Sequence, residues 1–165
     1  RPMLRTAVEW IIDTLQTLPA FVYLIPIVML FRVGDFTALI AIVLYAIAPA
    51  IRYTAHGVAQ VSPHLIEAGV MSGCTRRQIL TRIRLPLAVP DMLLGLNQTI
   101  LLALSMLVIT ALVGTRDLGQ VTYAALAKAD VGLGLVAGLS VAFIGMIADR
   151  LITAGSARLK THKGH

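Results

Sequence analysis

The sequence predicts an all-α protein, a polytopic bundle of helices that cross a membrane. The chain has 165 residues, of which 58% are apolar and 13% are charged, and its mean hydropathy is +0.85. A water-soluble domain of ordinary composition is less apolar than this. The apolar residues are grouped in runs of about 20 residues, and a helix of that length crosses roughly 30 Å of hydrocarbon.

Four apolar runs predict four membrane spans in one domain that covers the whole chain. They lie at about residues 15–31, 36–51, 87–113 and 131–152. The chain begins with Arg1 and Pro2 rather than with Met, and no signal-peptide pattern follows. We therefore expect it to be a C-terminal piece of a longer chain.

The first run is preceded by charged residues at helical spacing. Arg5, Glu9 and Asp13 follow one another at intervals of four residues, so this helix is expected to begin in water or in the headgroup layer. Pro19 and Pro26 lie within or next to the apolar run. Each proline removes a backbone donor and is expected to kink the helix.

The basic residues predict the orientation of the spans. Lys and Arg near span ends favour the cytoplasmic side. With residues 52–86 inside, the cytoplasmic set is Arg1, Arg5, Arg52, Arg76, Arg77, Arg82, Arg84, Arg150, Arg158, Lys160 and Lys163. Only Arg32, Arg116 and Lys128 then lie outside. Both ends of this chain are thus expected in the cytoplasm, and residues 120–129 form a short external helix.

The long cytoplasmic segment has helix signals of its own, which a simple loop does not need. Ser62 can cap a first helix, with Pro63 at its first position. Thr75 and Gln78 have the spacing of a capping box that starts a second helix. Pro86 is expected to end this second helix.

Seven positions in this segment have a distinctive spacing. They are Glu67, Ala68 and Gly69, then three residues, Gly73, nine residues, Ile83, one residue, and Leu85 with Pro86. This pattern resembles the E-A-A, G, I-x-L-P loop of permeases from binding-protein-dependent importers. The departure is Gly69, where the family usually has a second Ala, and glycine loosens the helix slightly.

The resemblance implies the permease core of a type I ABC importer in a bacterial inner membrane. In that family the loop forms coupling helices that fit a groove on a cytoplasmic ABC ATPase, which binds ATP and Mg²⁺. The other implied partners are a periplasmic or extracellular solute-binding protein and a second permease subunit, expected to be an identical copy. The implied mechanism is alternating access driven by the ATPase.

Two further stretches indicate a subfamily. Residues 14–21 and 96–106 resemble permeases that import glycine betaine, proline betaine, choline and related methylated amines. A permease for amino acids is the main alternative, and the sequence does not choose among the methylated amines. A channel or secondary transporter independent of ATP would need an ionisable residue deep in a span, whereas Asp91 and Asp149 are expected near span ends.

Polar residues inside the third span are candidates for the solute path. Asn97, Gln98 and Ser105 lie in an apolar run, where an unsatisfied polar group costs several kcal/mol. Asn97 and Gln98 either line the path or form hydrogen bonds between helices, and for Ser105 we favour the hydrogen bond. In the last span, small residues recur at helical spacing and predict close helix packing. They are Gly134, Gly138, Ala142 and Gly145.

Catalytic and cofactor motifs are not found in the sequence. No G-x4-G-K-[ST] loop is present, so the chain is not expected to be an enzyme or to bind a cofactor. The four histidines lack metal-ligand spacing. The basic residues lie between apolar runs without interleaved aromatic residues, so the net charge of +6 does not indicate nucleic acid.

Overall fold

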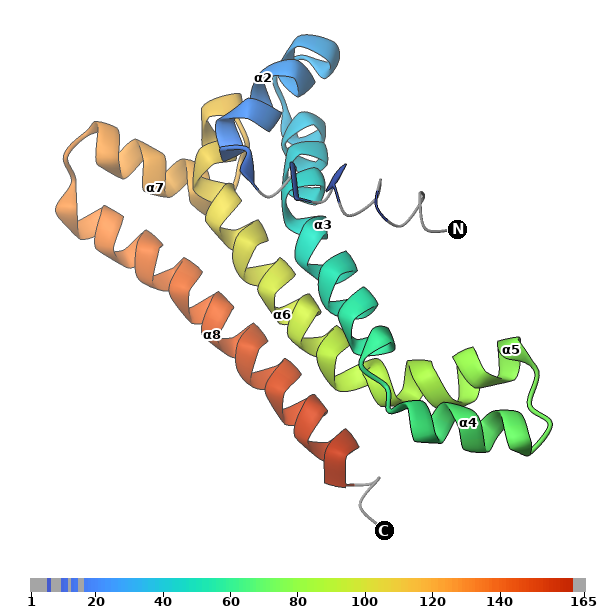
Figure 1. Ribbon diagram of the computed structural model, residues 1–165. Helices are drawn as coiled ribbons and strands as arrows, with labels where there is room; N and C mark the ends of the chain where they lie inside the picture. The colour runs from blue at the N-terminus through green and yellow to red at the C-terminus, as the bar shows by residue number, and fades with distance from the viewer. Residues whose placement is uncertain (1–5, 7–9, 12, 15–16, 162–165) are drawn as a thin grey trace. The chain divides into compact units, whose positions relative to one another are not determined.

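The computed structural model describes residues 6, 10–11, 13–14 and 17–161, with side chains as far as residue 155. In this part of the chain every regular element is a helix, which confirms the all-α prediction (Figure 1). The elements are α2 (Ala20–Phe31), α3 (Asp35–Ala59), α4 (Pro63–Met71), α5 (Arg76–Gln78), the π-helix η1 (Ile79–Arg84), α6 (Leu85–Thr110), the 3₁₀ helix η2 (Ala111–Val113), α7 (Leu118–Ala127) and α8 (Val131–Thr161).

Three helical stretches of the described chain are long and apolar enough to cross a membrane. They are Asp35–Ala59, Arg76–Val113 and Val131–Gly155. The shorter two have 25 residues each, which corresponds to about 37 Å of helix. Both α3 and α8 continue past the predicted ends of their spans, because backbone hydrogen bonding continues through the polar residues that follow an apolar run.

The first predicted span, residues 15–31, differs most from the structure. Its described helix α2 has 12 residues, about 18 Å of helix, which is too short by itself to cross the hydrocarbon. Pro19 does not kink a longer helix but precedes α2 with an extended backbone, at φ −58° and ψ 145°. A proline disfavours helical geometry in the residue before it, and Leu18 is accordingly not helical.

That prediction also includes Pro26 and several residues outside the described part of the chain. Pro26 lies inside α2, and the kink expected there stays a prediction. Residues 15 and 16 lie outside the described residues, and so do Arg5 and Glu9 of the predicted charged turn.

The chain divides into two compact units, which are described separately. The first unit comprises Arg1–Ala48 and Thr99–Ala148, and the second comprises Pro49–Gln98 and Asp149–His165. Whether they act as the single membrane domain expected from the sequence stays a prediction.

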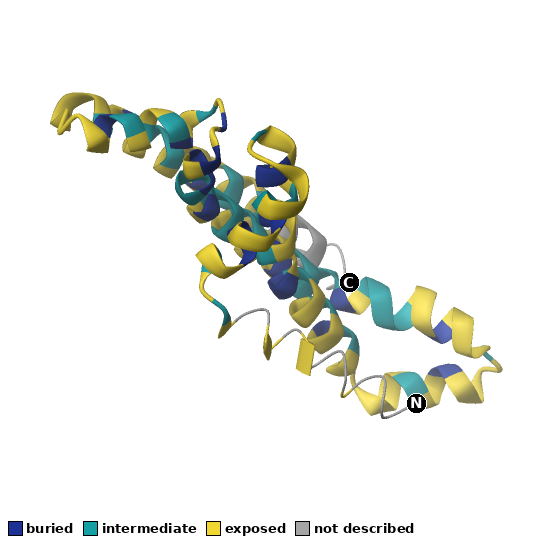
Figure 2. Cartoon of the chain, turned by 90° about the horizontal axis from the view of Figure 1, so that it is seen from above, coloured by how far each residue is buried: buried dark blue, intermediate teal, exposed yellow. Residues whose placement is uncertain are grey.

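The first unit has a small apolar core to which four helical elements contribute. Its buried residues come from α2, α3, the second half of α6 and η2, and Figure 2 colours such residues dark blue. They are Tyr23, Leu24, Ile27, Ala41, Met106 and Val113. The ring of Tyr23 packs edge-on against Tyr45 of α3, with 5.9 Å between centroids. Aromatic and aliphatic burial therefore joins α2 to the membrane helices.

In the second unit, α3 and α6 approach each other through glycines on both helices. A Cβ atom built on Gly57 of α3 would lie 2.7 Å from Cβ of Asp91 on α6. A Cβ atom on Gly95 of α6 would lie 2.7 Å from Cβ of Tyr53 and 3.3 Å from the Pro49 carbonyl oxygen on α3. Such distances leave no room for a side chain, so glycine permits the two backbones to pack closely.

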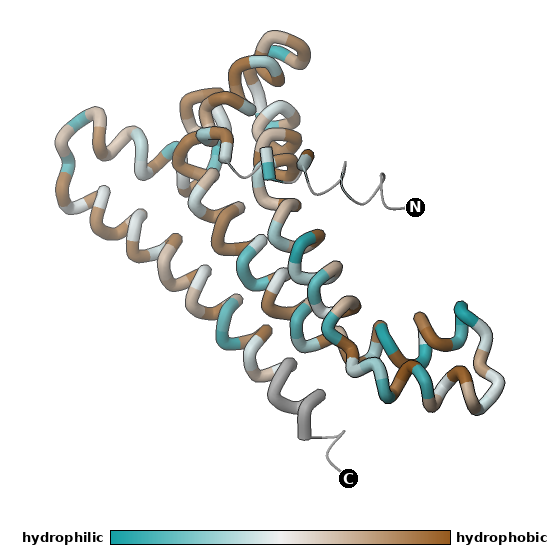
Figure 3. Tube along the Cα trace, in the orientation of Figure 1, coloured by the Kyte–Doolittle hydropathy of each residue, from teal (hydrophilic) through white to brown (hydrophobic). Residues whose placement is uncertain are grey.

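The outer faces of the long helices are apolar and largely uncovered within this chain. Only 11% of the apolar window of α6, and the same share of that of α8, is buried. Figure 3 shows apolar residues along most of α8, and a mixture of polar and apolar residues across α4, α5 and η1. These helix faces are therefore surfaces for lipid or for another subunit, because water would disfavour them.

The small-residue strip of α8 is used in part for packing in this chain. A Cβ atom on Gly134 would lie 3.6 Å from Ala125 of α7, and one on Gly145 would lie 3.3 Å from Leu104 of α6. Gly138 has no neighbour within 4 Å of such an atom. The prediction of close packing therefore holds at the two ends of the strip and not at Gly138.

We expect Gly95→Ala to destabilise the helix packing of the second unit. The new methyl group would lie 2.7 Å from Cβ of Tyr53, and relieving such overlap typically costs about 1–3 kcal/mol. The matched control is Gly138→Ala, where no atom lies within 4 Å and helix propensity alone favours alanine by about 1 kcal/mol. Thermal unfolding of the detergent-solubilised protein should give a lower midpoint for the first variant only, and equal midpoints would contradict this packing.

Candidate functional site: the helical hairpin between two membrane helices

The sequence motif folds as a hairpin in which α4 runs out to a turn and α5 with η1 returns to α6. α4 starts after Ser62, and Pro63 occupies its first turn as predicted. The predicted side-chain cap is wrong, because the Ser62 hydroxyl forms no capping hydrogen bond. Instead the Ser62 carbonyl accepts from the amides of Leu65 and Ile66, at 3.1 Å and 3.4 Å. A residue before proline is held extended, which orients this carbonyl into the helix.

The turn of the hairpin is a Schellman motif centred on Gly73. Gly73 has φ +77°, a conformation that glycine adopts without steric cost. Its amide donates to the Val70 carbonyl at 2.9 Å, and the Cys74 amide donates to the Gly69 carbonyl at 3.0 Å. The end of α4 requires a residue in the αL conformation, and Gly73 provides it. This requirement explains why the motif has glycine between the two helices.

The second helix of the hairpin starts with the predicted capping box. The Gln78 amide donates to Thr75 Oγ1 at 3.3 Å, and the Thr75 amide donates to Gln78 Oε1 at 2.8 Å. Both residues of the pair thus satisfy a backbone donor at the helix start. The short turn α5 is held in this way although it has only three residues.

Pro86 does not end the second helix, contrary to the prediction. The chain stays helical through η1 and α6, and Leu85 donates its amide to the Leu80 carbonyl, five residues earlier. Pro86 lies in the first turn of α6, directly after this π-helical segment. Proline has no N–H to donate and its ring crowds the preceding turn, and the altered register of a π-turn is one way in which a helix passes such a residue.

The two arms of the hairpin pack on each other at Gly69. Gly69 is buried in α4, and a Cβ atom there would lie 2.6 Å from Cδ1 of Ile83 and 3.7 Å from Cγ1 of Ile79. Both isoleucines belong to η1. The glycine that departs from the family pattern therefore faces the isoleucine of the same motif. Leu85 and Pro86, the last residues of the motif, are half-buried at the start of α6.

The outer face of the hairpin is exposed and combines apolar and basic residues. Val70 and Met71 next to the turn are 58% and 91% exposed, and Ala68 is exposed as well. Arg76 and Arg77 follow on α5 and are also exposed. An apolar tip with small residues and a basic flank suits docking of a protein partner, since lone monomers rarely expose such groups together.

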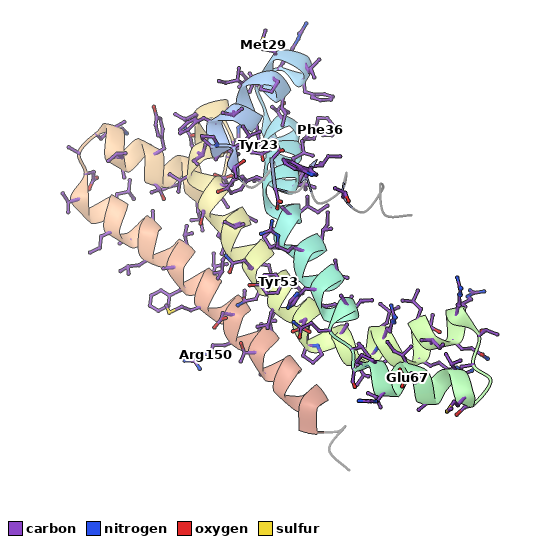
Figure 4. The ribbon with its side chains drawn as sticks, in the orientation of Figure 1. Tyr23, Met29, Phe36, Tyr53, Glu67 and Arg150 are labelled. Atoms are coloured by element: carbon purple, nitrogen blue, oxygen red, sulfur yellow. The ribbon has the colours of Figure 1, made fainter. Side chains whose placement is uncertain are left out.

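Glu67 lies on the exposed side of α4 (Figure 4). The contact seen in the described chain is with His64, at 3.9 Å between Nδ1 and Oε2. Both side chains are highly exposed, so this contact leaves Glu67 available to a partner.

The polar residues of the third span have three different environments. Asn97 Nδ2 donates to Asp149 Oδ1 of α8 at 2.6 Å, in a partly buried contact. Gln98 is exposed. The Ser105 hydroxyl donates to the Leu101 carbonyl of its own helix at 2.9 Å. The prediction that Ser105 forms a hydrogen bond between helices is therefore wrong. Serine in a helix often bonds to the carbonyl four residues earlier.

The contact between Asn97 and Asp149 was not predicted from the sequence. The sequence placed Asp149 near a span end, and the structure shows that its carboxylate accepts a hydrogen bond from α6. The signal available was a carboxylate in one apolar run and an amide in another, which need each other's hydrogen bonds in a membrane. No spacing rule could pair them, because 52 residues separate them.

The predicted external helix is present as α7, and its N-cap was missed. Asp117 Oδ1 accepts from the Gln120 amide at 3.1 Å. Asp35 at the start of α3 accepts from the Arg116 amide at 3.3 Å. The carboxylate before the helix is an ordinary N-cap signal, and it would have moved the predicted start from residue 120 to residue 118.

The fold and the hairpin define a polytopic α-helical membrane protein with a helical hairpin between two spans. Residues 1–161 match the family described as binding-protein-dependent transport system inner membrane component. The chain belongs to this family, which confirms the resemblance inferred from the motif.

Relatives and a solved structure agree with this assignment. The chain is 51% identical over 153 residues to the trimethylamine N-oxide transport system permease protein TmoV of Pelagibacter ubique, covering 92% of this chain and 21% of that protein. It is 42% identical to the glycine betaine/proline betaine transport system permease protein ProW of Escherichia coli, covering 87% and 41%. It is also 42% identical to the glycine betaine/carnitine transport permease protein GbuB of Listeria monocytogenes, covering 92% and 54%.

The chain therefore spans between about one fifth and about half of the length of these relatives. A chain of the MetNI methionine ABC transporter, in an inward-facing conformation, superposes with a TM-score of 0.86 at 18% identity. The match covers 96% of this chain and 77% of that one. At this identity the match shows a shared fold.

We expect Thr75→Ala to loosen the start of the second hairpin helix. The variant removes the hydroxyl that accepts from the Gln78 amide, and loss of such a cap typically costs about 1 kcal/mol. Amide hydrogen exchange in residues 76–84 should then rise about fivefold, the factor that corresponds to this free energy. Thr81→Ala is the control, since its hydroxyl bonds only to the Arg77 carbonyl of the same helix, and equal exchange in the two variants would contradict the role of the cap.

Proposed function

We propose that this chain is the transmembrane permease part of an ATP-driven importer of glycine betaine-type methylated amines. The observation that carries the proposal is the similarity over about nine tenths of the chain to permeases named for trimethylamine N-oxide, glycine betaine, proline betaine and carnitine transport. These solutes share a nitrogen that is bonded to several carbon groups and carries a positive charge. The shared chemistry supports a solute of this class rather than one particular compound.

The hairpin is proposed as the surface that docks a cytoplasmic ABC ATPase. The motif residues on it are Glu67, Ala68, Gly69, Gly73, Ile83, Leu85 and Pro86. Their environments support two roles. Glu67 and Ala68 are exposed near the apolar tip, where a partner can contact them. Gly69 and Ile83 pack the two arms together, so that a displacement of the tip also acts on η1.

The remaining partners follow from the family's description. The family's name supports a solute-binding protein as one partner, which we propose to act on the outer side, and we assign ATP with Mg²⁺ to the ATPase. A second copy of the permease would cover part of the apolar surface that α6 and α8 leave exposed. A homodimer is the simplest assembly of this kind, because closed two-fold pairs are the commonest oligomers.

The mechanism proposed is alternating access driven through the hairpin. ATP-dependent closure of two ATPase subunits displaces the docked tips, and each tip is continuous through η1 with the membrane helix α6. The displacement therefore reaches the span that contains Asn97 and Gln98 without an intervening loop. A helix transmits such a push because its backbone hydrogen bonds make it stiff along its axis.

The polar residues of α6 are assigned different roles in this mechanism. Asn97 holds α6 to α8 through Asp149, which makes it a positioning residue. Gln98 is exposed on the same helix and is proposed to face the solute path. Ser105 satisfies its hydroxyl within its own helix, so its oxygen can line the path without an energetic penalty.

The proposed function predicts ATP-dependent uptake of labelled glycine betaine. The full-length chain would be reconstituted in vesicles with its ATPase and its solute-binding protein, and uptake measured with and without ATP. An excess of choline, carnitine or trimethylamine N-oxide should lower the uptake of labelled glycine betaine by competition. An excess of methionine or histidine should leave this uptake unchanged. Competition by amino acids alone would assign the chain to amino-acid transport, and uptake that persists without the ATPase would contradict an importer driven by ATP.

We expect Gly73→Val to uncouple ATP hydrolysis from transport while insertion into the membrane is unchanged. Residue 73 has φ +77° with nothing within 4 Å, so the variant suffers from backbone strain rather than from a clash. A β-branched residue in this conformation costs about 1–3 kcal/mol and changes the turn at the docking tip. Gly73→Asn is the control, because asparagine tolerates this conformation. Normal coupled uptake by the valine variant would count against docking through this turn.

A further inference from the structure

The six residues of η1 form a π-helix inside a longer helical stretch. The stretch runs from Arg76 to Val113, and η1 occupies Ile79–Arg84, between the capped start of the hairpin helix and α6. The Leu85 amide bonds to the Leu80 carbonyl, five residues back instead of four. A π-turn of this kind equals one extra residue in an α-helix, and such turns occur frequently at functional sites.

A polar atom in η1 has no hydrogen-bond partner in the described chain. Arg84 Nε is buried, and no acceptor among the described residues bonds to it. A buried donor without a partner disfavours the arrangement that produces it. The unpaired Nε of Arg84 is therefore a local cost that lies within the π-helical segment.

The contacts that hold the π-register come from the other arm of the hairpin. Ile79 is buried, and both Ile79 and Ile83 face Gly69 of α4. The capping box of Thr75 and Gln78 fixes the start of the segment. Because α4 supplies the surface against which η1 packs, a partner that displaces α4 also changes the contacts of Ile79 and Ile83 with Gly69, which stabilise η1.

We propose that η1 is a register switch, which changes from the π-turn to a regular α-helical turn when a partner displaces the tip of the hairpin. The change removes the extra residue from the turn and rotates α5 relative to α6 by about 100°, the angle of one residue in an α-helix. Arg84 Nε then leaves its buried position, and Ile83 leaves Gly69. The switch rests on the proposed function, because it names the step by which the docked hairpin moves α6.

The switch resembles other conformational changes in which a helix has two discrete registers. Such shifts occur in microseconds to milliseconds, which is fast enough for a transport cycle. A two-state element of this kind responds to a partner that binds one register better than the other. In this chain the tip is the part that contacts the partner, and Arg84 and Ile83 are the residues whose surroundings differ between the two registers.

The first test deletes Thr81 from the full-length importer, reconstituted in vesicles with its ATPase and binding protein. The deletion removes the extra residue of the π-turn and leaves the segment α-helical in one register. Binding to the ATPase should be retained, while uptake of glycine betaine falls about tenfold or more. Thr81→Ala is the matched control and should keep uptake within about twofold, because it retains the length of η1. A deletion variant that transports like the control overturns the switch.

The second test measures the register directly and does not depend on the deletion. Spin labels would be attached at Arg77→Cys in α5 and Leu94→Cys in α6, in a Cys74→Ser background, with labelled chain diluted by unlabelled chain. Both labelled side chains are exposed. The distance distribution should gain a second population when ATP analogues close the ATPase, and a single unchanged population in every nucleotide state overturns the switch.

A third variant acts in the opposite direction. Arg84→Met removes the buried donor that opposes the π-turn, so the population typical of the nucleotide-free state should increase and uptake should fall. An unchanged distance distribution in this variant overturns the assigned role of Arg84. The proposed function is tested separately in the wild-type importer: if its ATPase does not bind or does not drive uptake, the function itself is wrong. If uptake is normal and the distances never change, only the switch is wrong.

Discussion

The constraint on which this structure depends is the lack of hydrogen-bond partners in hydrocarbon. A chain in the bilayer core must satisfy its backbone N–H and C=O groups within each span, and a helix does this without help from a neighbour. That requirement accounts for the three long helices of the described chain. It also explains the hydrogen bond from Asn97 Nδ2 to Asp149 and the one from the Ser105 hydroxyl to its own backbone.

The helices are joined by small residues rather than by a large buried core. Apolar side chains gain little from leaving lipid for another helix, so close backbone contact and shape decide which helices pack. Gly57 and Gly95 allow this contact between α3 and α6. At Gly119, a Cβ atom would overlap the Leu107 carbonyl oxygen, so the packing of α7 also requires glycine. The large exposed side chains remain free for lipid and for other subunits.

The hairpin is stabilised differently, because one of its ends is exposed and the other continues into a membrane helix. Its turn and its capping box satisfy the backbone N–H and C=O groups at the helix ends, as such motifs do in soluble proteins. Gly73 has the αL conformation, and Thr75 pairs with Gln78. Its tip exposes Met71 beside basic residues. Since the second arm is continuous with α6, a contact made in water can act on a helix in the membrane. The function proposed for the chain depends on this continuity.

The sequence by itself determined the features that depend on neighbours within a few residues. Apolar runs predicted the long helices, and the spacing of Thr75 and Gln78 predicted their capping box, because each signal acts over one or two turns of chain. The hairpin motif, with Gly73 at its turn, was recognisable for the same reason. The family followed from that motif.

Only the tertiary structure decided the features that depend on distant partners. Pro86 alone predicts a helix end, yet the π-turn before it, packed on Gly69, allows the helix to continue. The pairing of Asn97 with Asp149 joins residues 52 positions apart, and the need for glycine at position 95 comes from Tyr53 on another helix. Sequence patterns report which groups need a partner, whereas the packing of the helices decides which partner each group meets.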